Sequence, residues 1–125
     1  MKRRTRIGVG LFRPVSLAED EVILKESAAL YVRSVFFRLS GLLYLTNRRV
    51  IWTPFAIPLG YKPVLVEKSQ SLKVVGPSSL LDKITGYIWR IETPGGTHAF
   101  MLFWSPTLPG RTRQWVDAIN EWASS

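Results

Sequence analysis

The sequence contains no cysteine and only one histidine, His98. The lack of cysteine excludes disulfides, zinc–thiolate sites and thiol nucleophiles, and it leaves the redox compartment undetermined. His98 follows the turn at Gly95-Gly96, and it is interpreted as a lone surface histidine. The nine acidic residues show no paired-carboxylate spacing, and no nucleophile motif is present. We therefore expect no enzymatic activity, no cofactor and no metal site.

Long apolar runs are also absent, because no stretch approaches the roughly 18 consecutive apolar residues of a membrane-spanning helix. The N-terminus begins with basic residues, as a signal peptide does. Its apolar segment, Ile7 to Phe12, is however short, rich in glycine and ended by Arg13-Pro14. We expect no secretory signal. The expected location is the cytoplasm, with peripheral association at the inner membrane surface as a further option.

The chain has 125 residues, of which 46% are hydrophobic, enough for one domain with a core of its own. The net charge is +8, and four of the seventeen basic residues lie within the first six positions: Lys2, Arg3, Arg4 and Arg6. We predict a basic arm over residues 1–18 and one domain over 19–125. Such an arm suggests attraction to an anionic surface, either nucleic acid or membrane, and a solvated arm without a partner is the alternative.

From Val22 onward, short apolar runs alternate with turn residues, which predicts about seven strands. The clearest pair is Gly41–Thr46 with Arg49–Thr53. Asn47-Arg48 between them is expected to turn because asparagine tolerates the left-handed conformation. The other expected strands are Val22–Lys25, continued or extended by Ala28–Val35, then Val64–Glu67, Leu72–Val75, Ile84–Thr93 and His98–Trp104. Three prolines exclude a central strand or helix from the loop 54–63.

The C-terminal segment has a different period. Trp115, Val116, Ile119, Trp122 and Ala123 form one stripe of a helix with 3.6 residues per turn. Thr112 is the expected N-cap, and Pro109-Gly110 is expected to break the chain just before it. Seven antiparallel strands closed by one amphipathic helix predict a mainly β fold, a small barrel or orthogonal sandwich with the helix over one end.

The hairpin from Gly41 to Trp52 reads Gly-Leu-Leu-Tyr-Leu-Thr-Asn-Arg-Arg-Val-Ile-Trp. It resembles the signature of the GRAM and bacterial PH-like family: a glycine, an apolar-Tyr-Leu-Thr strand, an Asn-Arg-Arg turn and an apolar-aromatic strand. Glu21-Val22-Ile23-Leu24 looks like the first strand of that family, and the C-terminal helix looks like its closing helix. The resemblance spans residues 19–123 and is specific only in the hairpin.

The resemblance implies a PH-like barrel that binds anionic lipids or protein partners. In phosphoinositide-binding members, a lysine late in the first strand and an Arg-x-Arg in the second hold the headgroup, and Lys25 could be that lysine. The expected second strand, Leu42–Thr46, contains no arginine. Arg48 and Arg49 lie in the following turn, at the far end of the hairpin from the first loop. Their stems can pack on neighbouring strands while their charged heads stay in water.

Two loops supply the other candidate binding residues. Phe36 and Phe37 lie between Arg33 and Arg38, and adjacent strand residues face opposite sides, so both rings cannot be core. Aromatic rings flanked by cations suit the headgroup zone of an anionic membrane. The loop after Trp52 adds Phe55, Ile57, Tyr61 and Lys62. The alternatives are that one phenylalanine is core and the other lies under the arm, and that the second loop packs on itself.

We therefore predict weak peripheral association with anionic membrane lipid through these loops, assisted by the basic arm. The alternative is a protein-interaction or self-associating module. Aromatic residues occur on both faces of the last hairpin, and a barrel has one interior, so some rings must lie outside it, under the arm or in a homo-oligomer interface. Nucleic acid is favoured less, because no basic stripe alternates with aromatics on one strand face.

Overall fold

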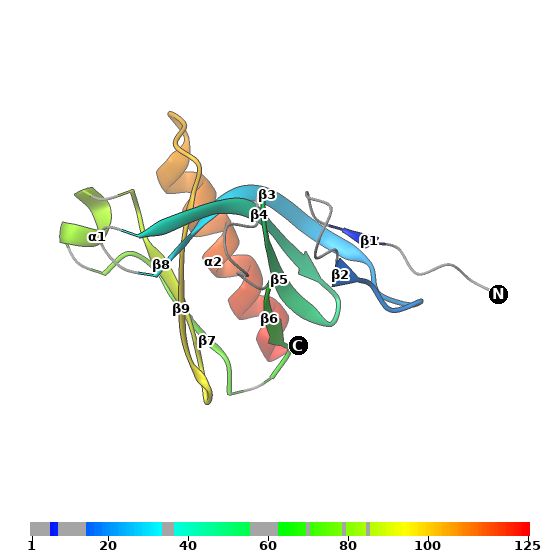
Figure 1. The fold of residues 1–125 in the computed structure, drawn as a ribbon. Helices are drawn as coiled ribbons and strands as arrows, with labels where there is room; N and C mark the ends of the chain where they lie inside the picture. The colour runs from blue at the N-terminus through cyan, green and yellow to red at the C-terminus, as the bar shows by residue number, and fades with distance from the viewer. Residues whose placement is uncertain are drawn as a thin grey trace.

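The computed structural model describes residues 6–7, 15–33, 37–55, 63–69, 71–78, 80–84 and 86–125, with the backbone alone at 6, 7, 81 and 84. A short ribbon of β1 (Arg6–Ile7) and β2 (Val15–Ser16) precedes the main sheet (Figure 1). The other elements are β3 (Ile23–Val32), β4 (Arg38–Thr46), β5 (Arg49–Pro54), β6 (Val64–Glu67), β7 (Lys73–Val75), α1 (Leu80–Ile84), β8 (Trp89–Thr93), β9 (Gly96–Leu102) and α2 (Leu108–Ser124).

The main sheet has seven antiparallel strands in the order β6-β5-β4-β3-β9-β8-β7. β3 pairs with β4 along its whole length, but it pairs with β9 only from Ala29 to Val32. β3 therefore belongs to both halves of the sheet, and α2 lies between these halves (Figure 1). The expected mainly β fold with a C-terminal helix is confirmed.

The hairpin of β4 and β5 forms as predicted, and its glycine has a physical reason. A Cβ at Gly41 would lie 2.2 Å from the Thr53 carbonyl oxygen and 2.7 Å from the Trp52 indole. The indole crosses β4 at this position, and its Nε1 donates a hydrogen bond to the Ala29 carbonyl at 3.1 Å. Gly41 thus leaves the space that lets the fully buried Trp52 tie β5 to β3.

The turn of this hairpin differs from the prediction. Among the residues that the structure describes, Tyr87 is the one non-glycine residue with a positive φ, so Asn47 is not left-handed. Instead the Thr46 hydroxyl accepts hydrogen bonds from the backbone N–H of Arg48 and Arg49. The Asn47 side chain reaches backwards, accepting from Val22 N–H at 2.8 Å and donating to the Asp20 carbonyl at 3.0 Å.

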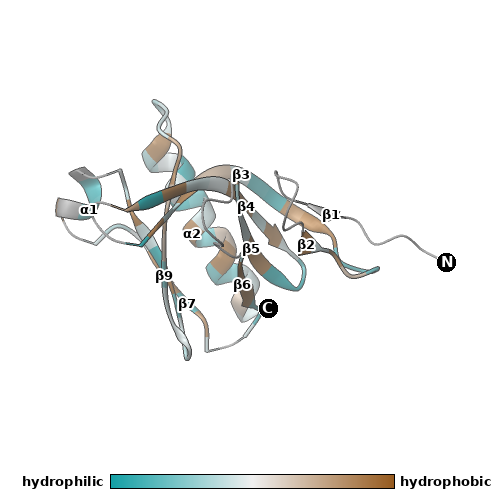
Figure 2. Cartoon of the chain, viewed as in Figure 1, coloured by the Kyte–Doolittle hydropathy of each residue, from teal (hydrophilic) through white to brown (hydrophobic). Residues whose placement is uncertain are grey.

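The main core lies between the concave side of the sheet and α2. Trp89 stacks on Trp115 with ring centroids 6.3 Å apart, and Ile119 and Trp122 continue the same helix face. Brown bands alternate with pale and teal ones along α2, as expected of a helix with one buried face (Figure 2).

The predicted start of this helix was wrong. α2 begins at Leu108, one turn before the predicted N-cap, and Thr112 is 1% exposed inside it. Proline lacks the N–H that a helix interior needs, but the first turn leaves its N–H groups unbonded in any case. Pro109 is therefore accommodated in the first turn instead of breaking the chain.

A second, smaller core covers the outer face of β4 and β5. Val15 and Leu17 pack there on Tyr44 and Ile51. The end of the segment expected to be an arm is thus buried against the sheet. The Tyr44 ring therefore lies outside the main core, under the segment that contains Val15 and Leu17.

The second predicted hairpin differs from the expectation in both strands: the first is shorter, and the second lies two residues earlier. β8 begins at Trp89, because α1 and a turn at Gly86 and Tyr87, with φ of 125° and 59°, occupy the preceding residues. β9 ends at Leu102, so Phe103 and Trp104 belong to the connection into α2. Within the described ranges, no helix is long and apolar enough to span a membrane.

Candidate functional site

The predicted first loop joins β3 to β4, and it brings three of the candidate residues together. The Arg33 N–H donates to the Phe37 carbonyl at 3.0 Å and closes the loop. Phe37 is 42% exposed, Arg33 is exposed and Arg38 is half-buried. Arg38 is the first residue of β4, so the second strand starts earlier than expected and does contain an arginine.

Phe55 lies at the same end of the sheet, directly after β5. Its N–H donates to the Ser40 carbonyl at 3.0 Å, one step beyond the Gly41–Pro54 pair of β4 and β5. We call Arg33, Phe37, Arg38 and Phe55 the rim. Other predicted members fall outside the described residues: Phe36, Ile57, Tyr61, Lys62, Lys2, Arg3 and Arg4, while Arg6 is described by its backbone alone.

Two residues near the end of β9 adjoin the rim, and the sequence interpretation did not include them. The Phe103 ring meets the Phe55 ring edge-on, with centroids 5.9 Å apart. Nη1 of Arg38 donates to the Met101 sulfur at 3.0 Å. The alternation of Met101 and Phe103 against the buried Phe100 and Leu102 was the available signal, since it places both outside the main core.

Lys25 lies apart from the rim. It pairs with Leu45 beside the hairpin turn, and the seven residues between it and Arg33 make a separation of about 26 Å in extended chain. Its ammonium lies 5.5 Å from the ring centre of Trp115, a cation–π contact with the closing helix. The structure therefore does not bring Lys25 together with the rim residues.

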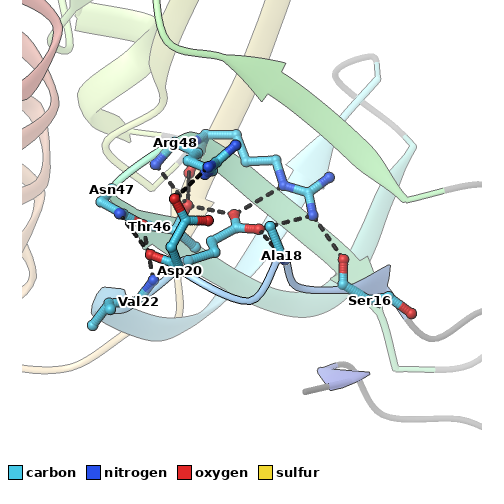
Figure 3. A network of polar contacts seen from close by, with 9 residues as sticks. Ser16, Ala18, Asp20, Val22, Thr46, Asn47 and Arg48 are labelled. Carbon is cyan, nitrogen blue, oxygen red and sulfur yellow. Dashed lines mark hydrogen bonds and ion pairs between the residues drawn. The ribbon is translucent and has the colours of Figure 1, made fainter. Parts of the chain in front are cut away.

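The hairpin turn holds a polar network instead of an open basic site (Figure 3). Glu21 is 8% exposed, and Arg49 donates to its two carboxylate oxygens at 2.9 and 3.1 Å. The expectation that both arginine heads stay in water was wrong for Arg49, whose side chain is 16% exposed, although Arg48 keeps 50% exposure while it pairs with Asp20.

The Glu21 carboxylate is also the acceptor for two further donors. The Thr46 hydroxyl lies 2.6 Å away and the Ala18 N–H lies 3.0 Å away. Burial acts to raise the pKa of Glu21, but the hydrogen bonds from Arg49, Thr46 and Ala18 outweigh it and lower the pKa from 4.5 to about 2. The carboxylate therefore stays ionised at neutral pH. Its hydrogen bonds join the segment before β3 to the hairpin turn, so the role of this end of the hairpin is structural.

His98 is half-buried and not a surface histidine. Its Nδ1 lies 2.9 Å from the Tyr31 hydroxyl, and the Tyr31 ring also packs near Trp52 and Phe100. Burial lowers the pKa of His98. Burial also raises the pKa of Tyr31, and the nearby charge of Arg33 opposes this second shift. A hollow of about 220 Å³ borders His98, and a groove of about 480 Å³ lies between α2 and the β7–α1 segment.

No protein-family model and no curated protein matches the chain. Solved structures do match. The C-terminal domain of an unknown protein from Leishmania infantum has a TM-score of 0.57 at 13% identity, over 82% of this chain and 84% of that one. The hSac2 domain from human phosphoinositide phosphatase Sac2 has a TM-score of 0.58 at 12% identity, over 86% and 73%. At such identity the likeness shows the fold alone, which is PH-like.

Proposed function

We propose that this chain is a non-enzymatic PH-like binding module of the GRAM type that associates with anionic membrane lipid on the cytoplasmic side. Its contact surface is the rim, assisted by the basic arm. The observation that carries the proposal is that Phe37, 42% exposed, lies between Arg33 and Arg38 in the loop that joins β3 to β4, at the end of the sheet where Phe55 follows β5.

The physical basis is a combination of two weak terms. Aromatic rings favour the headgroup zone of a bilayer, and each nearby cation adds roughly 1 kcal/mol on an anionic leaflet. Arg33 and Arg38 supply two cations, and the arm supplies Lys2, Arg3, Arg4 and Arg6. Binding of this kind depends on lipid charge and on ionic strength.

The separation of Lys25 from the rim argues against a closed headgroup pocket. Arg48 and Arg49 are engaged with Asp20 and Glu21 at the far end of the hairpin. We therefore propose that the module responds to surface charge density more than to the identity of one inositol lipid. The hSac2 domain comes from a phosphoinositide phosphatase by its name, and this supports a lipid surface as partner only by analogy of fold.

Co-sedimentation with vesicles tests the proposal. Phosphatidylcholine vesicles, with and without phosphatidylserine, are compared for the full chain and for Phe37→Ser. We expect binding to the anionic vesicles alone and a several-fold loss for Phe37→Ser. The matched control is Leu65→Ser, because Leu65 on β6 is 47% exposed and outside the rim.

Other results would overturn the lipid proposal. Equal binding to neutral and anionic vesicles, or none to either, contradicts a charged leaflet as the partner. Stable dimers in solution that bury the rim would support the self-associating alternative. Retention of oligonucleotides at moderate salt would support nucleic acid.

A further inference from the structure

Trp104 differs from every other tryptophan of the chain. It is 79% exposed, whereas Trp52, Trp89, Trp115 and Trp122 are between 0 and 7% exposed. It lies in the connection between β9 and α2, directly after Phe103. One exposed apolar side chain is ordinary on a protein surface, but Trp104 follows Phe103, whose ring contacts Phe55, so it is part of a larger aromatic group.

The backbone on either side of Trp104 is tied to the rest of the fold. The Phe103 N–H donates to the Ala28 carbonyl at 3.3 Å. Nη1 of Arg111 contacts the Phe103 carbonyl at 3.5 Å and the Ser105 hydroxyl at 3.2 Å, while its Nη2 donates to Ser27 at 2.8 Å. The indole is thus held outward by neighbours that are themselves anchored to β3 and α2.

The chain on either side of Trp104 carries basic residues and no acidic ones. No acidic residue occurs between Glu92 and Asp117, and this stretch contains Arg111 and the exposed Arg113. Trp104 adjoins the rim only on its Phe55 side, because the neighbouring Phe103 ring contacts Phe55. Arg33 lies farther off, five positions along the chain from Ala28, the partner of the Phe103 N–H. A negatively charged partner with an apolar layer beneath its charges complements this arrangement.

We propose that Trp104 is a second membrane anchor, inserted at the headgroup level of an anionic leaflet next to the rim. This inference rests on the proposed function and names a contact outside the first loop. Tryptophan is suited to this position, because its ring combines a large apolar area with one N–H donor. Two anchors on different connections, Phe37 and Trp104, fix the orientation of the module on the surface.

Tryptophan fluorescence gives a direct test, because the other four indoles are buried. Phosphatidylcholine vesicles containing phosphatidylserine should shift the emission of the full chain to shorter wavelength and protect it from acrylamide. Brominated lipid should quench it. Trp104→Ser should lose these responses and bind the vesicles roughly tenfold more weakly, the effect of removing one large apolar contact.

Controls separate this inference from the rim proposal. Trp104→Phe should recover part of the binding, and Leu65→Ser should leave binding unchanged, since Leu65 is 47% exposed on β6, three strands away from β3 in the sheet. If the full chain binds but Trp104 stays open to acrylamide and Trp104→Ser binds normally, the Trp104 inference is wrong while the rim proposal stands. If Trp104→Ser loses binding and Phe37→Ser does not, Trp104 is the anchor and the rim is not.

Discussion

At the level of single residues, Arg48 and Arg49 occupy adjacent positions in the hairpin turn but meet different environments. Arg48 pairs with Asp20 at the surface, where water and salt screen an ion pair and leave it little net effect on stability. Arg49 meets a Glu21 carboxylate whose side chain is 1% exposed. Removing one partner of such a buried pair leaves the other without compensation, which makes it far more costly.

Glu21 should therefore give the protein an acid-sensitive stability. Its pKa is about 2 in the folded chain, below the ordinary 4.5, so its contribution is complete above pH 4.5 and is lost as pH falls from 4.5 toward 2. A shift of that size corresponds to about 3 kcal/mol. Denaturant unfolding from neutral pH to pH 2 should show the wild type losing about 3 kcal/mol relative to Glu21→Gln.

Glu26→Gln is the matched control, since Glu26 is an exposed glutamate on β3, the strand that follows Glu21. It should keep the acid sensitivity of the wild type. If Glu21→Gln also lost stability in parallel with the wild type over this pH range, the buried carboxylate would not be its source.

At the level of elements, the strands of the hairpin could be predicted because two short apolar runs flank Asn47-Arg48 and a known signature covers them. The start of α2 could not, because Pro109 and Gly110 suit a chain break and a first helical turn equally. The site followed the same division. The loop with Arg33, Phe37 and Arg38 is local in sequence. Phe103, by contrast, is brought to Phe55 by the pairing of β9 with β3, which sequence alone does not reveal.

The contact of α2 with β7 depends on one side chain. The Asn120 amide accepts from the Val74 N–H and donates to the Val74 carbonyl, both at 3.1 Å, as a neighbouring strand would. β7 is an edge strand, so this amide occupies part of an otherwise open edge. Asn120→Ala should lower the free energy of unfolding by about 1 to 2 kcal/mol, because two hydrogen bonds are lost.

Amide hydrogen exchange at Val74 should accelerate in the same variant, more than at other core residues. A general loss of stability would instead accelerate exchange over the whole core. Glu121→Ala provides the comparison, because Glu121 is an exposed neighbour on α2. Unchanged exchange at Val74 in Asn120→Ala would show that the edge is protected in another way.

At the level of the whole molecule, the N-terminal segment contributes in two ways. Its end is structural: Val15 and Leu17 cover Tyr44 and Ile51, and the Ser16 carbonyl accepts from Arg49 at 2.8 Å. Its beginning carries four of the seventeen basic residues. Truncation should therefore separate electrostatic attraction from folding.

Deleting residues 1–6 removes Arg6 of β1 but keeps Val15 and Leu17 of the second core, so the free energy of unfolding should stay within about 0.5 kcal/mol of that of the full chain. The deletion should weaken binding to phosphatidylserine-containing vesicles at least about tenfold at low salt, since four cations of roughly 1 kcal/mol each are removed. The remaining binding should depend less on salt.

Deleting residues 1–18 should destabilise the fold as well, because it uncovers the second core. Replacing Lys2, Arg3 and Arg4 by glutamine keeps the chain length and should reproduce most of the electrostatic loss. An unchanged affinity and salt dependence after removal of residues 1–6 would show that the arm takes no part, and the rim and Trp104 would then have to account for the binding alone.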